Sequence, residues 1–155
     1  MKNIALFAGS FCPFTKGHED IVRKALPLFD HLYIALGHNH AKEDIFPVEQ
    51  RLQWIRDLYD GEPKVTVMAY EGLTTDLCRQ LGANYLVRGV RNATDFAAEE
   101  ELRRINLTLN PEVETIFIPC SPEWAIVSSS LVRELWSLHA DYSAFLSYKL
   151  PEKAE

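Results

Sequence analysis

The chain has 155 residues, of which 47% are hydrophobic and 25% are charged, and it carries a formal net charge of -6. This length suits a single domain with one substantial core. The acidic balance argues against a general nucleic-acid-binding protein, which needs a basic face for phosphates, and no run approaches the roughly 20 apolar residues of a membrane-spanning helix.

Five short apolar runs, rich in β-branched and aromatic residues, predict buried strands. Their nearly continuous apolar character, without strict alternation, is typical of strands covered on both faces. The runs span residues 4–8, 31–36, 64–69, 85–87 and 115–119.

Amphipathic stretches between and after these runs predict helices. Pro27 should perturb the last turn of the first helix, because proline lacks a backbone N–H. The fourth helix is expected to be capped by Thr94 or Asp95 and the fifth by one of three consecutive serines, while Gly82 ends the third. The predicted helices span residues 17–29, 47–59, 73–81, 94–109 and 128–138.

Strands that alternate with helices at this spacing predict an α/β fold. We expect a Rossmann-like, doubly wound sheet of five parallel strands with helices on both faces. One domain is expected over residues 1–150, followed by a frayed tail at 151–155. Ligands of such sheets bind outside the carboxyl ends of the strands, so the loops after the strands are the places to search for function.

The loop after the first strand, residues 9–18, combines flexibility with groups that bind anions. Gly9 permits a close approach of the backbone, and Ser10 offers a hydroxyl. Gly17 and His18 fall at the start of a helix, where free N–H groups and the helix dipole favour an anion. A lone histidine in a turn is more often a solvated or capping residue, so this loop alone predicts an anion site and no particular reaction.

Two further segments at strand ends carry similar groups. Arg88 and Arg91 flank Gly89 after the fourth predicted strand and suit phosphate clamps, although a surface pair is an equal alternative. The serines at 128–130 open the last helix, where they cap it and leave N–H groups free for phosphate. The apolar strip at 124–127 offers a wall for a flat base; core packing is the alternative, and it suits Ile126 better than Trp124.

Together these segments resemble the adenylyltransferases of the His-x-Gly-His nucleotidyltransferase superfamily, and the closest match is to the phosphopantetheine adenylyltransferase family. The Thr-x-Gly-His motif at residues 15–18 indicates the superfamily. The Arg-Gly-x-Arg block, the Glu-Trp pair and the triple serine indicate the family. The agreement covers nearly the whole chain and rests on Gly9-Ser10-Phe11, Phe29-Asp30-His31, Lys42, Arg51, Arg88-Gly89-Val90-Arg91, Asp95-Phe96, Glu99, Asn106, Pro111-Glu112, Glu123-Trp124 and Ser128-Ser129-Ser130.

The resemblance implies a reaction in which ATP and 4'-phosphopantetheine give dephospho-coenzyme A and pyrophosphate. This is the penultimate step of coenzyme A synthesis, and it proceeds reversibly by direct in-line attack with Mg2+ as cofactor. Coenzyme A is an implied feedback ligand, and the implied assembly is a homohexamer. Neither nucleic acid nor a membrane is an expected partner, and no metal site made of protein side chains is expected.

The resemblance also implies roles for individual residues. His18 stabilises the transition state at the α-phosphate, with Lys42 and Arg91 as further catalytic residues. The acceptor, 4'-phosphopantetheine, is bound by Ser10, Lys42, Thr74 and Arg88. ATP is bound by Ser10, Phe11, His18, Gly89, Val90, Arg91, Glu99, Trp124, Ala125, Ile126, Val127, Ser128, Ser129 and Ser130.

The main departure from the family pattern is Cys12, which stands where an aspartate is usual. A buried inert thiol is the favoured interpretation and a reactive thiol near a helix N-terminus the other. The chain has three cysteines, an odd number without metal-ligand spacing, so a reducing cytoplasmic compartment is expected. Two other functions stay open: a related nucleotidyltransferase acting on nicotinate mononucleotide or glycerol phosphate, and a nucleotide sensor in which Cys12 marks lost catalysis.

Overall fold

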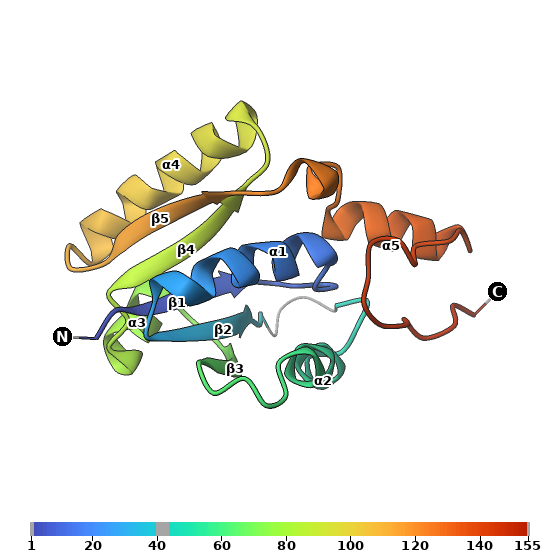
Figure 1. Cartoon of the computed structure of the whole chain (residues 1–155), viewed down its shortest axis with the longest axis horizontal. Coiled ribbons are helices and arrows are strands. Elements are labelled where there is room, and N and C mark those ends of the chain that lie inside the picture. The colour runs from blue at the N-terminus through green and yellow to red at the C-terminus, as the bar shows by residue number, and fades with distance from the viewer. Residues whose placement is uncertain (1, 40–43, 155) are drawn as a thin grey trace.

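One parallel sheet forms the centre of the protein (Figure 1). The computed structural model describes residues 2–39 and 44–154. The strand order is β3-β2-β1-β4-β5, and every pairing is parallel. The predicted five-stranded, doubly wound topology is thereby confirmed. The strands are β1 (Ile4–Gly9), β2 (His31–Gly37), β3 (Val65–Tyr70), β4 (Tyr85–Val90) and β5 (Glu114–Pro119).

The fourth strand is longer than its apolar run predicts. Arg88 pairs with Phe117, Gly89 with Ile118 and Val90 with Pro119, so the pairing with β5 continues through the polar end of β4. Apolar patterning misses this extension because Arg88 is only partly buried and faces a cavity. Arg88 and Gly89 therefore lie within a strand, and only Arg91 follows it.

The helices agree with the predicted order, and Pro27 perturbs the first one as expected, since a 3-10 turn replaces its last turn. Gly82 ends α3 with φ of 69°. The predicted caps of α4 were wrong: Asn92 is the cap, and its Oδ1 accepts from the Asp95 N–H at 2.9 Å. Ser128 caps α5. The helices are α1 (Lys16–Ala25), α2 (Val48–Leu58), α3 (Thr74–Leu81), α4 (Ala93–Leu109) and α5 (Ser129–Ser137), with 3-10 turns η1 (Leu26–Leu28) and η2 (Pro122–Trp124).

Both faces of the sheet are buried, as its continuous apolar strands predict. Along β1, Phe7 joins a core with residues of α1 and α2, whereas Leu6 and Ala8 join a second core with residues of α3. Because successive strand residues point to opposite faces, this alternation places helices on both sides of the sheet. The sheet is thus fixed from both sides, and the loops at its carboxyl edge rest on a rigid base.

A third core lies beyond the sheet and includes Cys12, Val132, Leu146 and Leu150. It packs the segment after α5 against the loop that follows β1. The tail from Pro151 is exposed, and two hydrogen bonds join it to α5: Trp136 Nε1 donates to the Pro151 carbonyl at 2.7 Å, and Lys153 Nζ donates to the Ser137 carbonyl. Within the described part of the chain, no helix is long and apolar enough to cross a membrane.

Candidate active site

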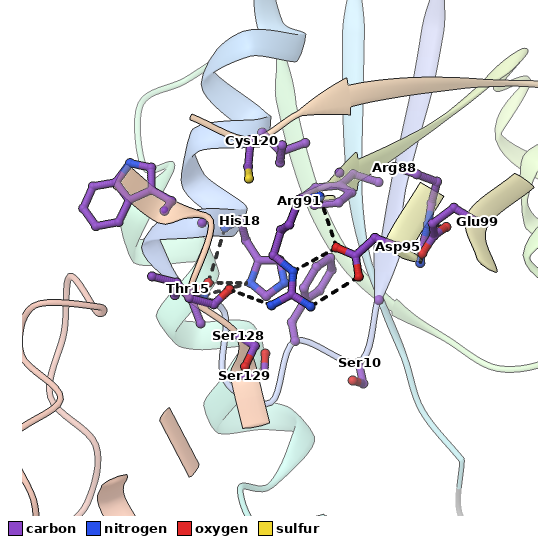
Figure 2. Close-up of a pocket in the computed structure, with 18 of the residues that line it drawn as sticks. Ser10, Thr15, His18, Arg88, Arg91, Asp95, Glu99, Cys120, Ser128 and Ser129 are labelled. Atoms are coloured by element: carbon purple, nitrogen blue, oxygen red, sulfur yellow. Dashed lines mark hydrogen bonds and ion pairs between the residues drawn. The ribbon is translucent and has the colours of Figure 1, made fainter. Parts of the chain in front are cut away.

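A cavity of about 340 Å³ opens at the carboxyl ends of β1 and β4 (Figure 2). Three segments that are far apart in sequence meet around it: the loop after β1 with the start of α1, the end of β4 with α4, and the segment that joins β5 to α5. Predicted site residues in its wall are Ser10, Phe11, His18, Arg88, Gly89, Arg91, Glu99, Trp124, Val127, Ser128 and Ser129.

The loop after β1 is shaped by close packing of its own residues. A Cβ atom on Gly9 would stand 2.9 Å from the Phe11 ring, so any larger residue at this position would have to displace that buried ring. Phe11 itself has φ of 44°, in the left-handed region, and its ring is buried. The loop therefore has one conformation that the core supports, with the Ser10 side chain left exposed at the cavity.

Arg51 of α2 is almost fully buried, and its side chain holds this loop in place. Its Nη1 donates to the Ser10 carbonyl at 2.5 Å, and its Nε donates to the Phe46 carbonyl at 2.9 Å. Its Nη2 pairs with the Asp44 carboxylate at 2.5 Å. These partners satisfy the buried guanidinium, which would otherwise be costly, and fix the backbone at Ser10.

His18 is oriented by the N-terminus of α1. Thr15 is the N-cap, and its hydroxyl accepts from the His18 N–H, while the Thr15 N–H donates to Nδ1 of His18 at 2.9 Å. A backbone N–H can only donate, so Nδ1 is an acceptor and the neutral ring carries its proton on Nε2. The capping box thus selects the tautomer that offers Nε2–H as a donor.

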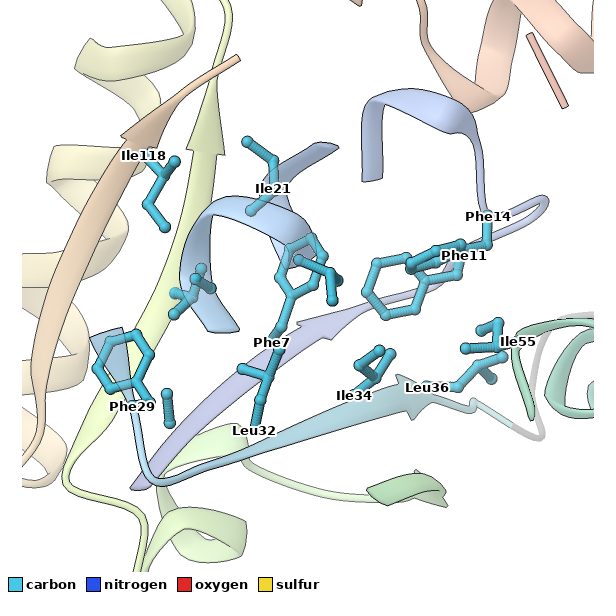
Figure 3. Packing of buried hydrophobic residues seen from close by; sticks show 14 of the residues in the cluster. Phe7, Phe11, Phe14, Ile21, Phe29, Leu32, Ile34, Leu36, Ile55 and Ile118 are labelled. Carbon is cyan, nitrogen blue, oxygen red and sulfur yellow. The ribbon is translucent and has the colours of Figure 1, made fainter. Parts of the chain in front are cut away.

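Aromatic rings surround the His18 imidazole and keep it uncharged. The Phe14 ring stacks on it at 5.1 Å, and the Phe11 ring meets it edge-on at 5.1 Å. Figure 3 shows these two rings beside Phe7 in the main core. Burial, followed by the positive charges of Arg88 and Arg91, lowers the pKa of His18 to about 4. The ring is therefore a neutral hydrogen-bond donor at physiological pH.

Arg88 is held in a fork by Glu99 of α4. Its Nε and Nη2 donate to the two Glu99 oxygens at 2.6 and 2.8 Å, and Nη1 donates to the Ala8 carbonyl at 2.8 Å. This bidentate pairing fixes the plane of the guanidinium. The position of the Arg88 guanidinium is thus set by β1 and by α4.

Arg91 is held in the same way by Asp95, one turn earlier in α4 than Glu99. Its Nε donates to Asp95 Oδ2 at 2.9 Å, and its backbone N–H donates to the same oxygen at 3.1 Å. Asp95 also lines the cavity. The sequence indicated Asp95 only as a candidate helix cap and not as a residue of the site, yet its spacing of four residues from both Arg91 and Glu99 is the signal that places the two carboxylates on one helix face.

The segment before α5 supplies the remaining wall. Trp124, Val127, Ser128 and Ser129 line the cavity, and Lys16 Nζ lies 5.8 Å from the centre of the Trp124 ring. The interpretation of Ile126 as a core residue was wrong, because its side chain is 71% exposed while Val127 is buried. The 3-10 turn η2 rotates the strip so that only part of it faces inward.

A second, smaller cavity of about 230 Å³ lies beside the first and shares Ala8, Gly9, Ser10 and Arg88 with it. It extends to Thr74 at the start of α3, whose hydroxyl is 2.8 Å from the Tyr70 hydroxyl. Leu102 and Asn106 of α4 complete its other side. The two cavities therefore meet at the carboxyl end of β1, with Ser10 and Arg88 at their junction.

The structure thus brings most of the predicted site residues to these two cavities. Val90, Ala125, Ile126 and Ser130 line neither of them, and the predicted roles of individual residues stay predictions. Lys42 lies outside the described residues.

The described residues contain no group of three or more histidine, cysteine or acidic side chains that could hold a metal ion. The two carboxylates in the larger cavity, Asp95 and Glu99, are paired with arginines. The described residues therefore do not form a protein cage for Mg2+.

Cys12 packs away from both cavities. Its side chain is buried in the third core with Phe46 and Val132, and its carbonyl accepts from Arg133 Nη1 at 2.7 Å. All three cysteines of the chain are free thiols. The burial of Cys12 agrees with the favoured interpretation, in which it replaces the usual aspartate as a packing residue.

Comparisons with known proteins identify the family of the chain. A family profile described as cytidylyltransferase-like matches residues 6–135. A phosphopantetheine adenylyltransferase of Cytophaga hutchinsonii is 43% identical over 150 residues, which cover 97% of this chain and all of the relative. A phosphopantetheine adenylyltransferase of Porphyromonas gingivalis is 47% identical over 145 residues, or 94% of each chain.

Solved structures with lower identity share the fold. A bifunctional NMN adenylyltransferase/ADP ribose pyrophosphatase from Francisella tularensis superposes on 97% of this chain with a TM-score of 0.75 at 17% identity, and this chain spans 46% of its length. A candidate nicotinate-nucleotide adenylyltransferase from Vibrio parahaemolyticus gives a TM-score of 0.65 at 21% identity, with 96% of this chain and 95% of that chain covered. The identity and coverage of its sequence relatives show that this chain belongs to the phosphopantetheine adenylyltransferase family.

Proposed function

We propose that this chain transfers the adenylyl group of ATP to 4'-phosphopantetheine, giving dephospho-coenzyme A and pyrophosphate. The observation that carries the proposal is the junction of two cavities at Ser10 and Arg88. ATP occupies the larger cavity, which is lined by His18 and by Trp124, Val127, Ser128 and Ser129. The acceptor occupies the smaller one, with its phosphate at the junction and its pantetheine arm toward Thr74.

The residues suit a direct displacement. The acceptor phosphate is already an anion, so the reaction needs no covalent nucleophile from the protein. Positioning of the two substrates for in-line attack on the α-phosphorus, together with charge stabilisation, supplies the catalysis. His18 donates through Nε2–H to an α-phosphate oxygen, and this hydrogen bond strengthens as charge develops in the transition state.

Arg88 and Arg91 bind the phosphates of different substrates. Arg88, at the junction, holds the acceptor phosphate, and Arg91, beside His18, holds the phosphates of ATP. Glu99 and Asp95 keep the two guanidinium groups in place. A phosphate that approaches meets donors whose orientation is already fixed, which reduces the entropy cost of binding.

Other parts of the proposal rest on the family. Mg2+ arrives as part of the MgATP substrate, since this ion is usually bound through substrate phosphates with few protein ligands. Lys42 remains a proposed contact of the acceptor phosphate, and coenzyme A a proposed feedback ligand. A cytoplasmic location agrees with the three free thiols. A homohexamer agrees with the apolar residues that α4 exposes, namely Phe96, Leu102, Ile105 and Leu109.

A single assay tests the proposed reaction. The protein is incubated with ATP and Mg2+ plus 4'-phosphopantetheine, nicotinate mononucleotide or glycerol phosphate in separate reactions, and pyrophosphate release is measured. Turnover is expected only with 4'-phosphopantetheine. Turnover only with another acceptor would contradict the assignment, and ATP binding without turnover would favour a nucleotide sensor.

A further inference from the structure

Asp20 is a buried carboxylate in the helix that carries His18, and it has no place in the reaction described above. Asp20 is 4% exposed, and it lines neither of the two substrate cavities. Burying a carboxylate is costly unless it is fully hydrogen-bonded, so a position of this kind calls for an explanation.

Both oxygens of Asp20 accept hydrogen bonds from a segment that lies 101 residues away. Oδ2 accepts from the Ser121 N–H at 2.8 Å, and Oδ1 accepts from the Ser121 hydroxyl at 3.0 Å. Two cations of the same helix complete the shell, because Arg23 lies 2.7 Å from Oδ1 and Lys24 lies 3.2 Å from Oδ2. Each oxygen thus has two donors, and none of its capacity goes to a substrate.

These contacts sit where the chain leaves the sheet. The Cys120 N–H donates to the Val90 carbonyl at 2.9 Å, at the end of the β4–β5 pairing. Ser121 comes next, and Lys24 Nζ donates to the Pro119 carbonyl at 2.7 Å. Figure 1 shows the connection from β5 to α5 beside α1. Asp20 and Lys24 therefore fasten the start of this connection to the helix that carries His18.

Local backbone hydrogen bonds connect Ser121 to residues in the wall of the larger cavity. The Trp124 N–H donates to the Ser121 carbonyl at 2.9 Å, and the Val127 N–H donates to the Trp124 carbonyl at 3.0 Å. Ser128 then begins α5. Because these hydrogen bonds link Ser121 to Trp124 and Trp124 to Val127, a displacement of Ser121 would also displace Trp124 and Val127, which line the cavity.

We propose that Asp20 is a positioning residue for the nucleotide: by holding Ser121, its carboxylate sets the place of the cavity-lining Trp124 and Val127 relative to His18. This inference rests on the proposed function only in taking the larger cavity as the ATP site. The carboxylate is charged throughout the working pH range, because the hydrogen bonds from Ser121, Arg23 and Lys24 outweigh the effect of burial and lower its pKa to about 2.

The test is the Asp20→Asn variant, which keeps the shape of the side chain. Each carboxylate oxygen of Asp20 accepts hydrogen bonds from two donor groups. In either orientation of the new amide, its NH2 group would therefore face donors and lose the hydrogen bonds that the carboxylate oxygen accepts. We expect the ATP dissociation constant, measured by calorimetry with Mg2+ and without acceptor, to rise about tenfold, in line with the loss of hydrogen bonds to a charged group. The KM for the acceptor should change less than twofold.

Asp30→Asn is the matched control. Asp30 also accepts a backbone hydrogen bond, from the Asn3 N–H at 2.6 Å, but it lies at the opposite edge of the sheet and is exposed. This variant should leave ATP affinity unchanged. Ser121→Ala removes only the hydroxyl contact and should weaken ATP binding about threefold, so the inference stays testable if Asp20→Asn does not fold.

Three results would overturn the inference. The first is unchanged ATP affinity in a folded Asp20→Asn protein, and the second is an equal loss for ATP and acceptor, which indicates general disorder. The third is unchanged ATP affinity in Ser121→Ala. A protein that binds ATP but turns over another acceptor would contradict the proposed reaction and leave the role of Asp20 standing.

Discussion

Two segments face the same cavity and are held in different ways. The loop after β1 is anchored from two helices: the buried Arg51 of α2 donates to the Ser10 carbonyl, and the partly buried Ser129 and Arg133 of α5 donate to the Pro13 and Cys12 carbonyls. The segment between β5 and α5 depends on the cluster around Asp20, while its Ile126 side chain stands in solvent.

This difference suggests a division of work within one site. The loop after β1 orients His18 and the acceptor junction, where small displacements reduce the rate, and three of its backbone carbonyls are held by side chains of α2 and α5. The β5–α5 connection forms the nucleotide wall, and its start is anchored to a single helix, α1, through Asp20 and Lys24. Substitutions at loop anchors should therefore change stability or kcat, whereas substitutions at connection anchors should change ATP affinity.

The largest expected effect is on stability, at Arg51. Arg51→Met keeps most of the volume but leaves the Ser10 and Phe46 carbonyls and the Asp44 carboxylate without their partner. The free energy of unfolding should fall by about 3 kcal/mol, measured by urea denaturation. Arg56→Met is the control, since Arg56 is an exposed residue of the same helix. Equal stability of the two variants would show that the loop is not anchored through Arg51.

The next effect is on the rate, at His18. His18→Ala should lower kcat about 100-fold with little change in ATP affinity, because the Nε2–H donor acts mainly in the transition state. Steady-state kinetics at saturating ATP measure the change. His139→Asn removes a histidine that lines neither cavity and should leave kcat unchanged. An unaltered kcat in His18→Ala would remove this residue from the mechanism.

The buried state of His18 also predicts a pH dependence of stability. Its pKa is about 4 in the folded protein and about 6.5 when unfolded. Below pH 6.5 the unfolded chain binds the proton first, so stability is lost as pH falls from 6.5 toward 4, by about 2.5 kcal/mol. His18→Gln should lack this loss. Urea denaturation of both proteins at pH 7, 5.5 and 4.5 measures the difference, and parallel curves would contradict the buried neutral ring.

The fold was predictable from the sequence because its signals are local and strong. Continuous apolar runs marked every strand, and Pro27 and Gly82 acted on their helices as proline and glycine do. The N-terminal cap of α4 was harder to predict, because Asn92, Thr94 and Asp95 are all of residue types that favour the cap position. Only the fold shows that the Asn92 side chain reaches the Asp95 N–H.

The site was predictable in its parts but not in its connections. The sequence and the family resemblance together pointed to His18, Arg88 and Arg91. The contacts of Arg88 with Glu99 and of Asp20 with Ser121 depend on how distant segments meet in space. No pattern along the chain states that two residues 101 positions apart share a hydrogen bond.

Ile126 shows the same limit on a smaller scale and gives the smallest predicted effect. An apolar strip does not say which of its residues turns inward, and the 3-10 turn before Ile126 sends its side chain outward while Val127 is buried. Ile126→Ser should therefore change the free energy of unfolding by less than about 0.5 kcal/mol and ATP affinity by less than twofold. Val127→Ala, one residue along, should lower the free energy of unfolding by about 1 kcal/mol or more and weaken ATP binding. Thermal unfolding and calorimetry distinguish the two. If both variants lost ATP affinity equally, the whole strip would face the nucleotide, and the connection would be as tightly fixed as the loop after β1.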